Sequence, residues 1–331
     1  MAEPFDSKAV NGAAAALLKG DRRALARAIT LVESTRARDQ REAEDLLTAL
    51  LPHAGGAIRI GISGAPGVGK STFIEAFGLH LTGLGKTVAV FAIDPSSRRS
   101  GGSILGDKTR MEKLSRAPRA YIRPSPAGTT LGGVARRTRE SMLLAEASGF
   151  DIVLIETVGV GQSETAVADM TDLFVLLASP GGGDDLQGIK RGVMELADLL
   201  LVTKADGDLL AAANRAAADY QGALHLMRPK HPGLSPEVLK VSAVKGAGIG
   251  RAWDEMASIH AALASGGGLA RLRAEQSRRW FWSEVQTLLS EAILDDPGLA
   301  ADAARLETAV AQGGSLPAAA ARTLLGRFRG A

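Results

Sequence analysis

The sequence contains no cysteine. This absence excludes disulfide bridges, thiolate nucleophiles, iron–sulfur clusters and zinc sites built on cysteine. Aromatic residues make up only 4% of the chain, and nowhere do about 20 apolar residues follow one another, the length that a membrane-spanning helix needs. The N-terminus has no apolar segment flanked by basic residues and a cleavage site. We therefore expect a soluble, cytoplasmic protein that does not act on a membrane.

The charge of the chain is nearly balanced. Lys and Arg number 39 and Asp and Glu 36, which leaves a net charge of +3. Because no basic arm accompanies this small excess, nucleic acid is not an expected partner. The five histidines are scattered, with no pair at the helical spacing of metal ligands, so we assign them structural or surface roles. The 331 residues are 46% apolar, as in an ordinary globular protein.

Short and almost wholly apolar runs alternate with helical segments from residue 58 onward. A strand covered by helices on both faces is buried on both faces, so this pattern predicts an α/β domain with a mostly parallel sheet. The expected strands are 58–63, 87–93, 120–123, 151–156, 173–179, 198–203 and 237–242. The expected helices of this domain are 70–84, 132–148, 208–228 and 248–263.

Helices are also expected before and after this domain. Apolar residues recur at helical spacing between residues 10 and 52, in roughly two elements. The run Ser265–Gly268, which contains three glycines, predicts a hinge. Beyond it, 270–294 is amphipathic, and shorter helices are expected at 300–311 and 316–328.

A phosphate-binding motif follows the first expected strand. The sequence GAPGVGKS is a complete GxxxxGK[ST], placed between a strand and a helix. In such a P-loop the backbone N–H groups surround a phosphate, and the helix that follows points its positive end at the anion. Lys70 would reach the β- and γ-phosphates, and the Ser71 hydroxyl would bind Mg²⁺. The predicted phosphate-binding residues are Gly64, Ala65, Pro66, Gly67, Val68, Gly69, Lys70, Ser71 and Thr72.

The base is indicated by Thr203-Lys204-Ala205-Asp206, a variant of the NKxD element that selects guanine. The Asp206 carboxylate can accept hydrogen bonds from the N1–H and the amino group of guanine, which adenine lacks. Thr203 replaces the asparagine that holds the purine and braces the loop, so we expect weaker guanine selectivity. A chance TKAD run is the alternative, but Ser242, Ala243 and Val244 follow the next strand as in the SA[KL] loop of G proteins. We therefore predict that GTP and GDP are the ligands.

Candidate Mg²⁺ ligands follow two further strands. Glu156 ends a buried strand in the ETVG sequence, where most G proteins have DxxG, and Gly159 could offer its N–H to the γ-phosphate. Asp94 follows strand 87–93, and Asp107 ends a polar, glycine-containing loop. Their carboxylates are hard oxygen ligands of the kind that Mg²⁺ prefers. For Asp107 a helix N-cap role is left open as an alternative. The predicted metal set is Ser71, Asp94, Asp107 and Glu156, and the predicted catalytic set is Lys70, Asp94, Asp107 and Glu156.

Together these motifs resemble the SIMIBI-class GTPases associated with methylmalonyl-CoA mutase, the bacterial relatives of the human methylmalonic aciduria type A protein. The most specific part of the resemblance is DPSSRRSGGSILGDKTRM, residues 94–111, and the whole runs from about Arg22 to Ala331. It implies a homodimeric, GTP-dependent chaperone that binds the mutase, gates delivery of adenosylcobalamin, and protects or reactivates the enzyme. It also places Asp94, Asp107 and Glu156 on Mg²⁺ and switch positions, Asp206 on the guanine contact, and 179–190 on a third switch.

The resemblance and the motifs divide the chain into an N-terminal helical extension (1–54), a P-loop GTPase domain (55–264) and a C-terminal helical dimerisation arm (265–331). Trp280, Phe281 and Trp282 are adjacent on one helix, so they cannot all face one core. A dimer interface accounts for them, and packing on the chain's own N-terminal helices is the alternative. No DxHxxG motif is present, so we expect no direct binding of cobalamin.

Hydrolysis is expected to be slow in the isolated protein and stimulated by its partner. Positioning and charge stabilisation dominate phosphoryl transfer, and the sequence offers only unassigned candidates, namely Arg98, Arg99, Arg110 and Gln162. Three other functions are alternatives. A metal-insertion GTPase predicts a histidine-rich tract or cysteine ligands, which are missing. A small-molecule P-loop kinase predicts no guanine element, and a transport ATPase predicts a preference for ATP.

Overall fold

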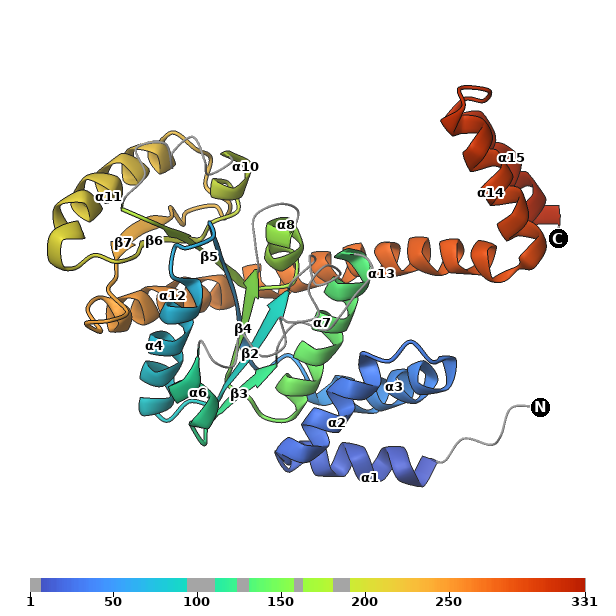
Figure 1. The fold of residues 1–331 in the computed structure, drawn as a ribbon. Coiled ribbons are helices and arrows are strands. Elements are labelled where there is room, and N and C mark those ends of the chain that lie inside the picture. Colours follow the sequence, from blue (N-terminus) through green and yellow to red (C-terminus); the bar gives the residue numbers. More distant parts are fainter. Residues whose placement is uncertain (1–6, 94–110, 124–130, 158–162, 181–190, 331) are drawn as a thin grey trace. The chain divides into compact units, whose positions relative to one another are not determined.

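A computed structural model describes residues 7–93, 111–123, 131–157, 163–180 and 191–330. Seven parallel strands of these residues form one sheet, in the order β3-β2-β4-β1-β5-β6-β7 (Figure 1). All seven predicted strands are confirmed, and with them the α/β fold class. The strands are β1 (Ile58–Gly64), β2 (Val88–Ile93), β3 (Ala120–Arg123), β4 (Ile152–Thr157), β5 (Leu173–Ala178), β6 (Leu199–Val202) and β7 (Glu237–Lys240).

The register of the central strands brings the sequence motifs to one edge of the sheet. β1 lies between β4 and β5, with Ile62 opposite Glu156 on one side and Val175 on the other. Because all strands run in the same direction, the segments after β1, β4, β6 and β7 leave the sheet at its carboxyl edge. In open α/β sheets this edge is where ligands bind.

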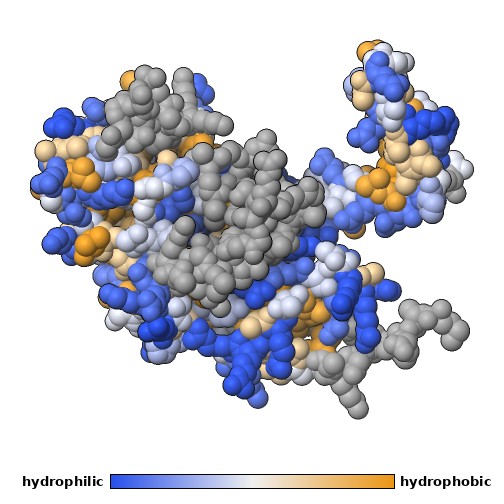
Figure 2. Space-filling view, viewed as in Figure 1, coloured by the Kyte–Doolittle hydropathy of each residue, from blue (hydrophilic) through white to orange (hydrophobic). Residues whose placement is uncertain are grey.

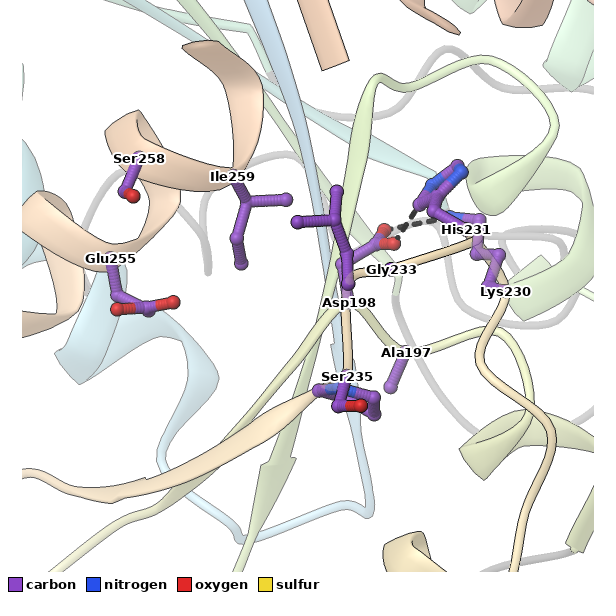
Figure 3. Close-up of a pocket in the computed structure, with 11 residues that line it drawn as sticks. Ala197, Asp198, Lys230, His231, Gly233, Ser235, Glu255, Ser258 and Ile259 are labelled. Carbon is purple, nitrogen blue, oxygen red and sulfur yellow. Dashed lines mark hydrogen bonds and ion pairs between the residues drawn. The ribbon is translucent and has the colours of Figure 1, made fainter. Parts of the chain in front are cut away.

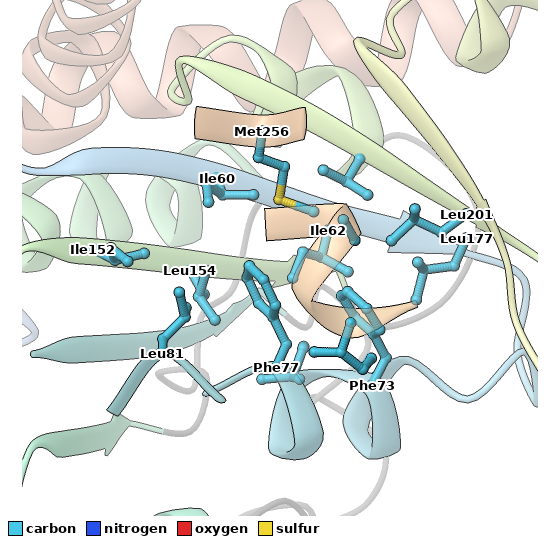
Figure 4. Close-up of a cluster of buried hydrophobic side chains, with 14 of the residues drawn as sticks. Ile60, Ile62, Phe73, Phe77, Leu81, Ile152, Leu154, Leu177, Leu201 and Met256 are labelled. Carbon is cyan, nitrogen blue, oxygen red and sulfur yellow. The ribbon is translucent and has the colours of Figure 1, made fainter. Parts of the chain in front are cut away.

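One face of the sheet packs against α4 (Lys70–Gly83) and α12 (Ile249–Ser265). Alternate strand residues such as Ile60 and Ile62 point into this layer, where they meet Phe73 and Phe77 of α4 and Met256 of α12 (Figure 4). The two phenylalanine rings are stacked, with their centroids 5.3 Å apart. This core fixes the helix that follows the P-loop.

The other face of the sheet is covered by α7 (Leu131–Ala147) and α8 (Ser163–Ala168) (Figure 1). Gly61 of β1 allows α8 to approach closely, because a Cβ at this position would lie 2.6 Å from a methyl group of Val167. With helices on both faces, β1, β2, β4, β5 and β6 are buried almost throughout.

Three aspartates occupy the amino edge of the sheet, each just before a strand. Each carboxylate accepts a hydrogen bond from a backbone N–H at the start of a neighbouring strand, a group that would otherwise lack a partner. This arrangement fixes where adjacent strands begin relative to each other. The pairs are Asp151 with Thr87 at 2.8 Å, Asp172 with Arg59 at 2.9 Å, and Asp198 with Phe174 at 2.7 Å.

The N-terminal region forms three helices, α1 (Ser7–Leu18), α2 (Arg22–Val32) and α3 (Ala37–Leu50), followed by the 3₁₀ turn η1 (Leu51–His53). The expectation of two elements was wrong because Asp21 caps a separate helix, accepting hydrogen bonds from Arg23 N and Ala24 N. The helices pack on α7, and Glu33 forms an ion pair with Arg123 of β3. These contacts join the helices to the sheet.

The remaining elements include short ones that the periodicity did not predict. They are α6 (Glu112–Arg116), α10 (Arg191–Met194) and the 3₁₀ turn η2 (Gly207–Leu209), which leads into α11 (Leu210–His225). The break at Ser265–Gly268 is confirmed, since α12 ends at Ser265 and α13 (Gly268–Asp295) begins at Gly268. The chain forms two compact units, Met1–Leu272 and Arg273–Ala331.

The second unit continues α13 and adds α14 (Pro297–Ala311) and α15 (Pro317–Gly330), which pack on each other. Asp302 of α14 forms an ion pair with Arg327 of α15. Hydrophobic side chains of these helices reach the surface between hydrophilic ones (Figure 2). Phe281 and Trp282 are 60% and 63% exposed, and their rings form an edge-to-face pair. The three-part division at residues 54 and 264 stays a prediction.

Candidate nucleotide site

The P-loop connects β1 to α4 at the carboxyl edge of the sheet. Gly64 lies so close to β5 that a Cβ at this position would be 2.5 Å from the carbonyl oxygen of Leu177. Gly69 precedes the first helical residue with φ of 98°, in the left-handed region that favours glycine. As the N-cap it has no side chain, so the first N–H groups of α4 are left for an anion.

Lys70 is the first residue of α4, and its side chain is buried against its own loop. Nζ donates hydrogen bonds to the carbonyl oxygens of Gly64 at 2.6 Å and Ala65 at 3.2 Å. Burial lowers the pKa of Lys70 below its usual value, and the charges of Glu156 and Glu164 oppose this shift. The partners of the ammonium here are neutral carbonyl oxygens, which an anionic phosphate could replace.

Ser71 and Glu156 meet across the loop. The Ser71 hydroxyl donates to Oε1 of Glu156 at 3.3 Å, and Glu156 is buried at the end of β4. A hydroxyl and a carboxylate oxygen are the ligand types that Mg²⁺ prefers, so these two residues fit the ion. Next to them, the Thr157 hydroxyl donates to the Ser63 hydroxyl at 2.9 Å, and this buried bond joins β4 to β1.

The TKAD element contacts the P-loop directly. The Thr203 hydroxyl lies 2.7 Å from the carbonyl oxygen of Val68 and 3.1 Å from that of Ala178. Lys204 has a φ of 53° and donates from Nζ to the carbonyl oxygen of Gly67 at 2.8 Å. Thr203 therefore braces the loop from the position that asparagine takes in NKxD.

Asp206 lies beside the loop that follows β7. The Ser242 hydroxyl donates to the Asp206 carboxylate, and it also accepts a hydrogen bond from Lys245 N at 3.1 Å. Ser242 is fully buried, so these bonds hold the carboxylate in one orientation. In the same loop Val244 is 80% exposed, whereas Ala243 is partly buried.

The structure thus brings together the P-loop, Glu156, the TKAD element and Ser242 at one edge of the sheet. Thr72 is exposed on α4. Asp94, Asp107 and Gly159 lie outside the described residues, as do Arg98, Arg99, Arg110, Gln162 and most of the predicted third switch, residues 181–190. The described residues contain no group of three or more acidic or histidine side chains that could hold a metal by themselves.

Glu164 belongs to none of the sequence motifs. This residue lies in the first turn of α8, is only 4% exposed, and acts electrostatically on Lys70. Ser63 and Thr157 were also missed, because their hydrogen bond joins residues that are far apart in the sequence. Burial of these polar groups beside the P-loop is visible only in three dimensions.

A pocket of about 210 Å³ lies at the opposite, amino edge of the sheet (Figure 3). Asp198 is central to it and contacts Lys230 Nζ at 2.6 Å and His231 Nε2 at 3.1 Å, while Glu255 lies on α12. Burial and the neighbouring charge of Glu237 raise the pKa of Glu255. The carboxyl ends of the strands, where the P-loop lies, are remote from this pocket, so it is not part of the nucleotide site.

A parallel sheet with a P-loop after its central strand and a TKAD element after β6 defines a P-loop GTPase. The model of the family described as methylmalonyl-CoA mutase-associated GTPase MeaB matches residues 25–297. The chain therefore belongs to this family. Membership confirms both the predicted family and the predicted GTPase activity, and it implies binding of guanine nucleotides.

Individual relatives cover nearly the whole chain. A putative GTPase of Caulobacter vibrioides is 56% identical over 94% of this chain and 95% of its own length. The mitochondrial methylmalonic aciduria type A homolog of Mus musculus is 49% identical over 95% of this chain and 78% of its own length. A solved structure described as an LAO/AO transport system kinase is 36% identical, with a TM-score of 0.78 and coverage of 99% of this chain and 100% of that one.

None of the helices in the described residues is both long and apolar enough to cross a membrane.

Proposed function

We propose that this protein is a GTP-hydrolysing chaperone of an adenosylcobalamin-dependent methylmalonyl-CoA mutase, which gates delivery of the cofactor and protects or reactivates the enzyme. The family description and the methylmalonic aciduria relatives support this client. The observation that carries the GTPase part is the direct bonding of the TKAD element to the P-loop through Thr203 and Lys204. Base recognition and phosphate binding therefore belong to one hydrogen-bonded unit.

In this proposal the chain's own residues bind and orient the triphosphate. The N–H groups at the start of α4 hold the phosphate oxygens, and Lys70 exchanges the carbonyls of Gly64 and Ala65 for the β- and γ-phosphates. Asp206, oriented by Ser242, accepts hydrogen bonds from the guanine edge. Phosphate charge developing during hydrolysis falls next to the Lys70 ammonium.

Mg²⁺ belongs to this proposal as the bound cofactor. Ser71 and Glu156 would hold it, with Asp94 and Asp107 as the further predicted ligands, and the ion would neutralise charge on the phosphates. Gly159 would contribute its N–H to the γ-phosphate. The same proposal includes slow hydrolysis by the isolated protein and its stimulation by the mutase. It also includes partner sensing by residues 179–190 and a homodimeric state. Cobalamin itself is proposed to stay with the partner.

The proposal is tested by steady-state hydrolysis of GTP and ATP, with the purified protein alone and with methylmalonyl-CoA mutase added. We expect slow turnover of GTP that the mutase accelerates, and little turnover of ATP. Fast hydrolysis by the isolated protein that the mutase does not change would contradict the chaperone role. Acceleration by a small metabolite in place of the mutase would favour a kinase.

A further inference from the structure

The hydroxyl of Thr203 is fully engaged by the protein. Thr203 follows β6, is only 4% exposed, and has its Oγ1 2.7 Å from the carbonyl oxygen of Val68 and 3.1 Å from that of Ala178. A hydroxyl carries a single proton, and both neighbours are acceptors only. Whichever carbonyl receives this proton, Thr203 has no second proton to donate.

An asparagine at this position would have two N–H donors, one for the loop and one for the purine. On the proposed assignment of the TKAD element to the base, we infer that Thr203 is a positioning residue that braces the P-loop and makes no hydrogen bond to the purine N7. N7 is an acceptor, so the lone pairs of the threonine hydroxyl cannot bind it. The base is then recognised through its opposite edge, by Asp206.

Because Thr203 has no proton to donate to N7, it affects the affinity for nucleotides but not the preference for guanine over adenine. N7 is an acceptor in both guanine and adenine, so a missing bond to N7 weakens the two nucleotides alike. The groups that distinguish guanine are N1–H and the amino group, which face a carboxylate. The Asp206–Ser242 pair therefore carries the preference for guanine, and the threonine lowers affinity without reducing selectivity.

The experiment measures dissociation constants of the full chain for GTP, 7-deaza-GTP and ATP by titration calorimetry. 7-Deaza-GTP replaces N7 by a C–H group and leaves the edge that Asp206 reads unchanged. We expect the wild-type protein and Thr203→Ser, which keeps the hydroxyl, to bind GTP and 7-deaza-GTP with equal affinity. A preference of fivefold or more for GTP over 7-deaza-GTP would overturn the inference.

Two further variants test the brace and the donor count. Thr203→Val has the same shape without the hydroxyl, and we expect it to weaken GTP and ATP by the same factor, about two- to tenfold for one hydrogen bond. Thr203→Asn supplies the second donor and should acquire a preference for GTP over 7-deaza-GTP of similar size. The inference would be contradicted if Thr203→Val bound GTP as tightly as the wild type or had a different ratio of GTP affinity to ATP affinity. It would also be contradicted if folded Thr203→Asn bound GTP and 7-deaza-GTP equally well.

Failure of this inference is distinguishable from failure of the proposed function. If the wild-type protein binds no GTP, the nucleotide assignment itself is wrong. If it binds GTP well but depends on N7, only the role of Thr203 is wrong.

Discussion

The Ser242 hydroxyl donates a hydrogen bond to the carboxylate of Asp206, and this bond links the loops that follow β7 and β6. The same hydroxyl accepts the N–H of Lys245, so its position is fixed from both sides. The loop itself is closed by Gly248, where a Cβ would lie 2.2 Å from the carbonyl oxygen of Lys240. A rigid turn thus orients the group that is proposed to recognise guanine.

Replacing Ser242 by alanine removes this orientation while keeping the charge of Asp206. We expect GTP affinity to fall at least about tenfold, because a hydrogen bond to a charged group contributes about 1.5–3 kcal/mol. ATP affinity should change less, so the ratio of GTP affinity to ATP affinity should decrease. Titration calorimetry measures both, with Lys245→Ala, which keeps the backbone N–H, as the control. An unchanged ratio in Ser242→Ala would remove Ser242 from the base site.

Lys70→Ala tests the P-loop assignment. The substitution removes the ammonium and its hydrogen bonds to Gly64 and Ala65, so we expect tight binding of GTP to be lost. Circular dichroism should show an intact fold, since the core of α4 is built by Phe73 and Phe77 and not by Lys70. Lys204→Ala, which removes the other bond from a lysine to the loop, should weaken binding less. Normal GTP affinity in Lys70→Ala would exclude the role proposed for this residue.

Much of the fold could be predicted because burial on both faces of the sheet makes the strands almost wholly apolar. The aspartates before β4, β5 and β6 can be seen in the sequence, but their hydrogen-bond partners cannot be predicted from it. The order of the strands determines these partners, and periodicity does not reveal that order. The short helices α6 and α10 have five and four residues, too few to repeat an apolar stripe. Their positions depend on tertiary packing.

At the site, the motifs predicted the participants and not their contacts. Thr203 and Val68 are 135 residues apart. The bond between them depends on β5 lying between β1 and β6, with Leu177 opposite Gly64 and Ala178 opposite Val202. Neither the donor count at Thr203 nor the burial of Glu164 follows from spacing. In the sequence Thr203 is only a departure from NKxD, whereas in the structure its hydroxyl contacts the carbonyl oxygens of Val68 and Ala178.

Asp198→Ala should destabilise the protein strongly. The substitution leaves the N–H of Phe174 and the ammonium of Lys230 without their carboxylate partner at the amino edge of the sheet. We expect the free energy of unfolding to fall by about 3 kcal/mol. This is the low end of the range for a broken buried ion pair, because Lys230 keeps some contact with water. Asp198→Asn can still accept the N–H of Phe174 and should lose less. Urea unfolding measures both, and a loss below about 1 kcal/mol in the alanine variant would contradict this role.

Asp151 should contribute to stability in a pH-dependent way. Burial raises its pKa, but hydrogen bonds from the backbone and side chain of Thr87 and the charges of Lys86 and Arg119 outweigh this, so the pKa lies below its ordinary value of 3.8. A lowered pKa in the folded state means that the stabilisation is present above 3.8 and is lost as the pH falls through the lower, folded value. The difference in unfolding free energy between wild type and Asp151→Asn should therefore shrink on acidification. A difference that grows below pH 3.8 would contradict the assignment.

Self-association should depend on Phe281 and Trp282 of α13. Their side chains are 60% and 63% exposed, and an interface that covered them would remove large apolar surfaces from water. We expect the double variant Phe281→Ala/Trp282→Ala to raise the dissociation constant of the proposed dimer at least about tenfold, because a single hot-spot side chain at an interface centre contributes about 2 kcal/mol or more. Sedimentation velocity over a concentration series measures this constant. Leu316→Ala is the matched control, since Leu316 is an equally apolar and 76% exposed residue next to α15. Equal dissociation constants for the double variant and the wild type would place the dimer interface elsewhere.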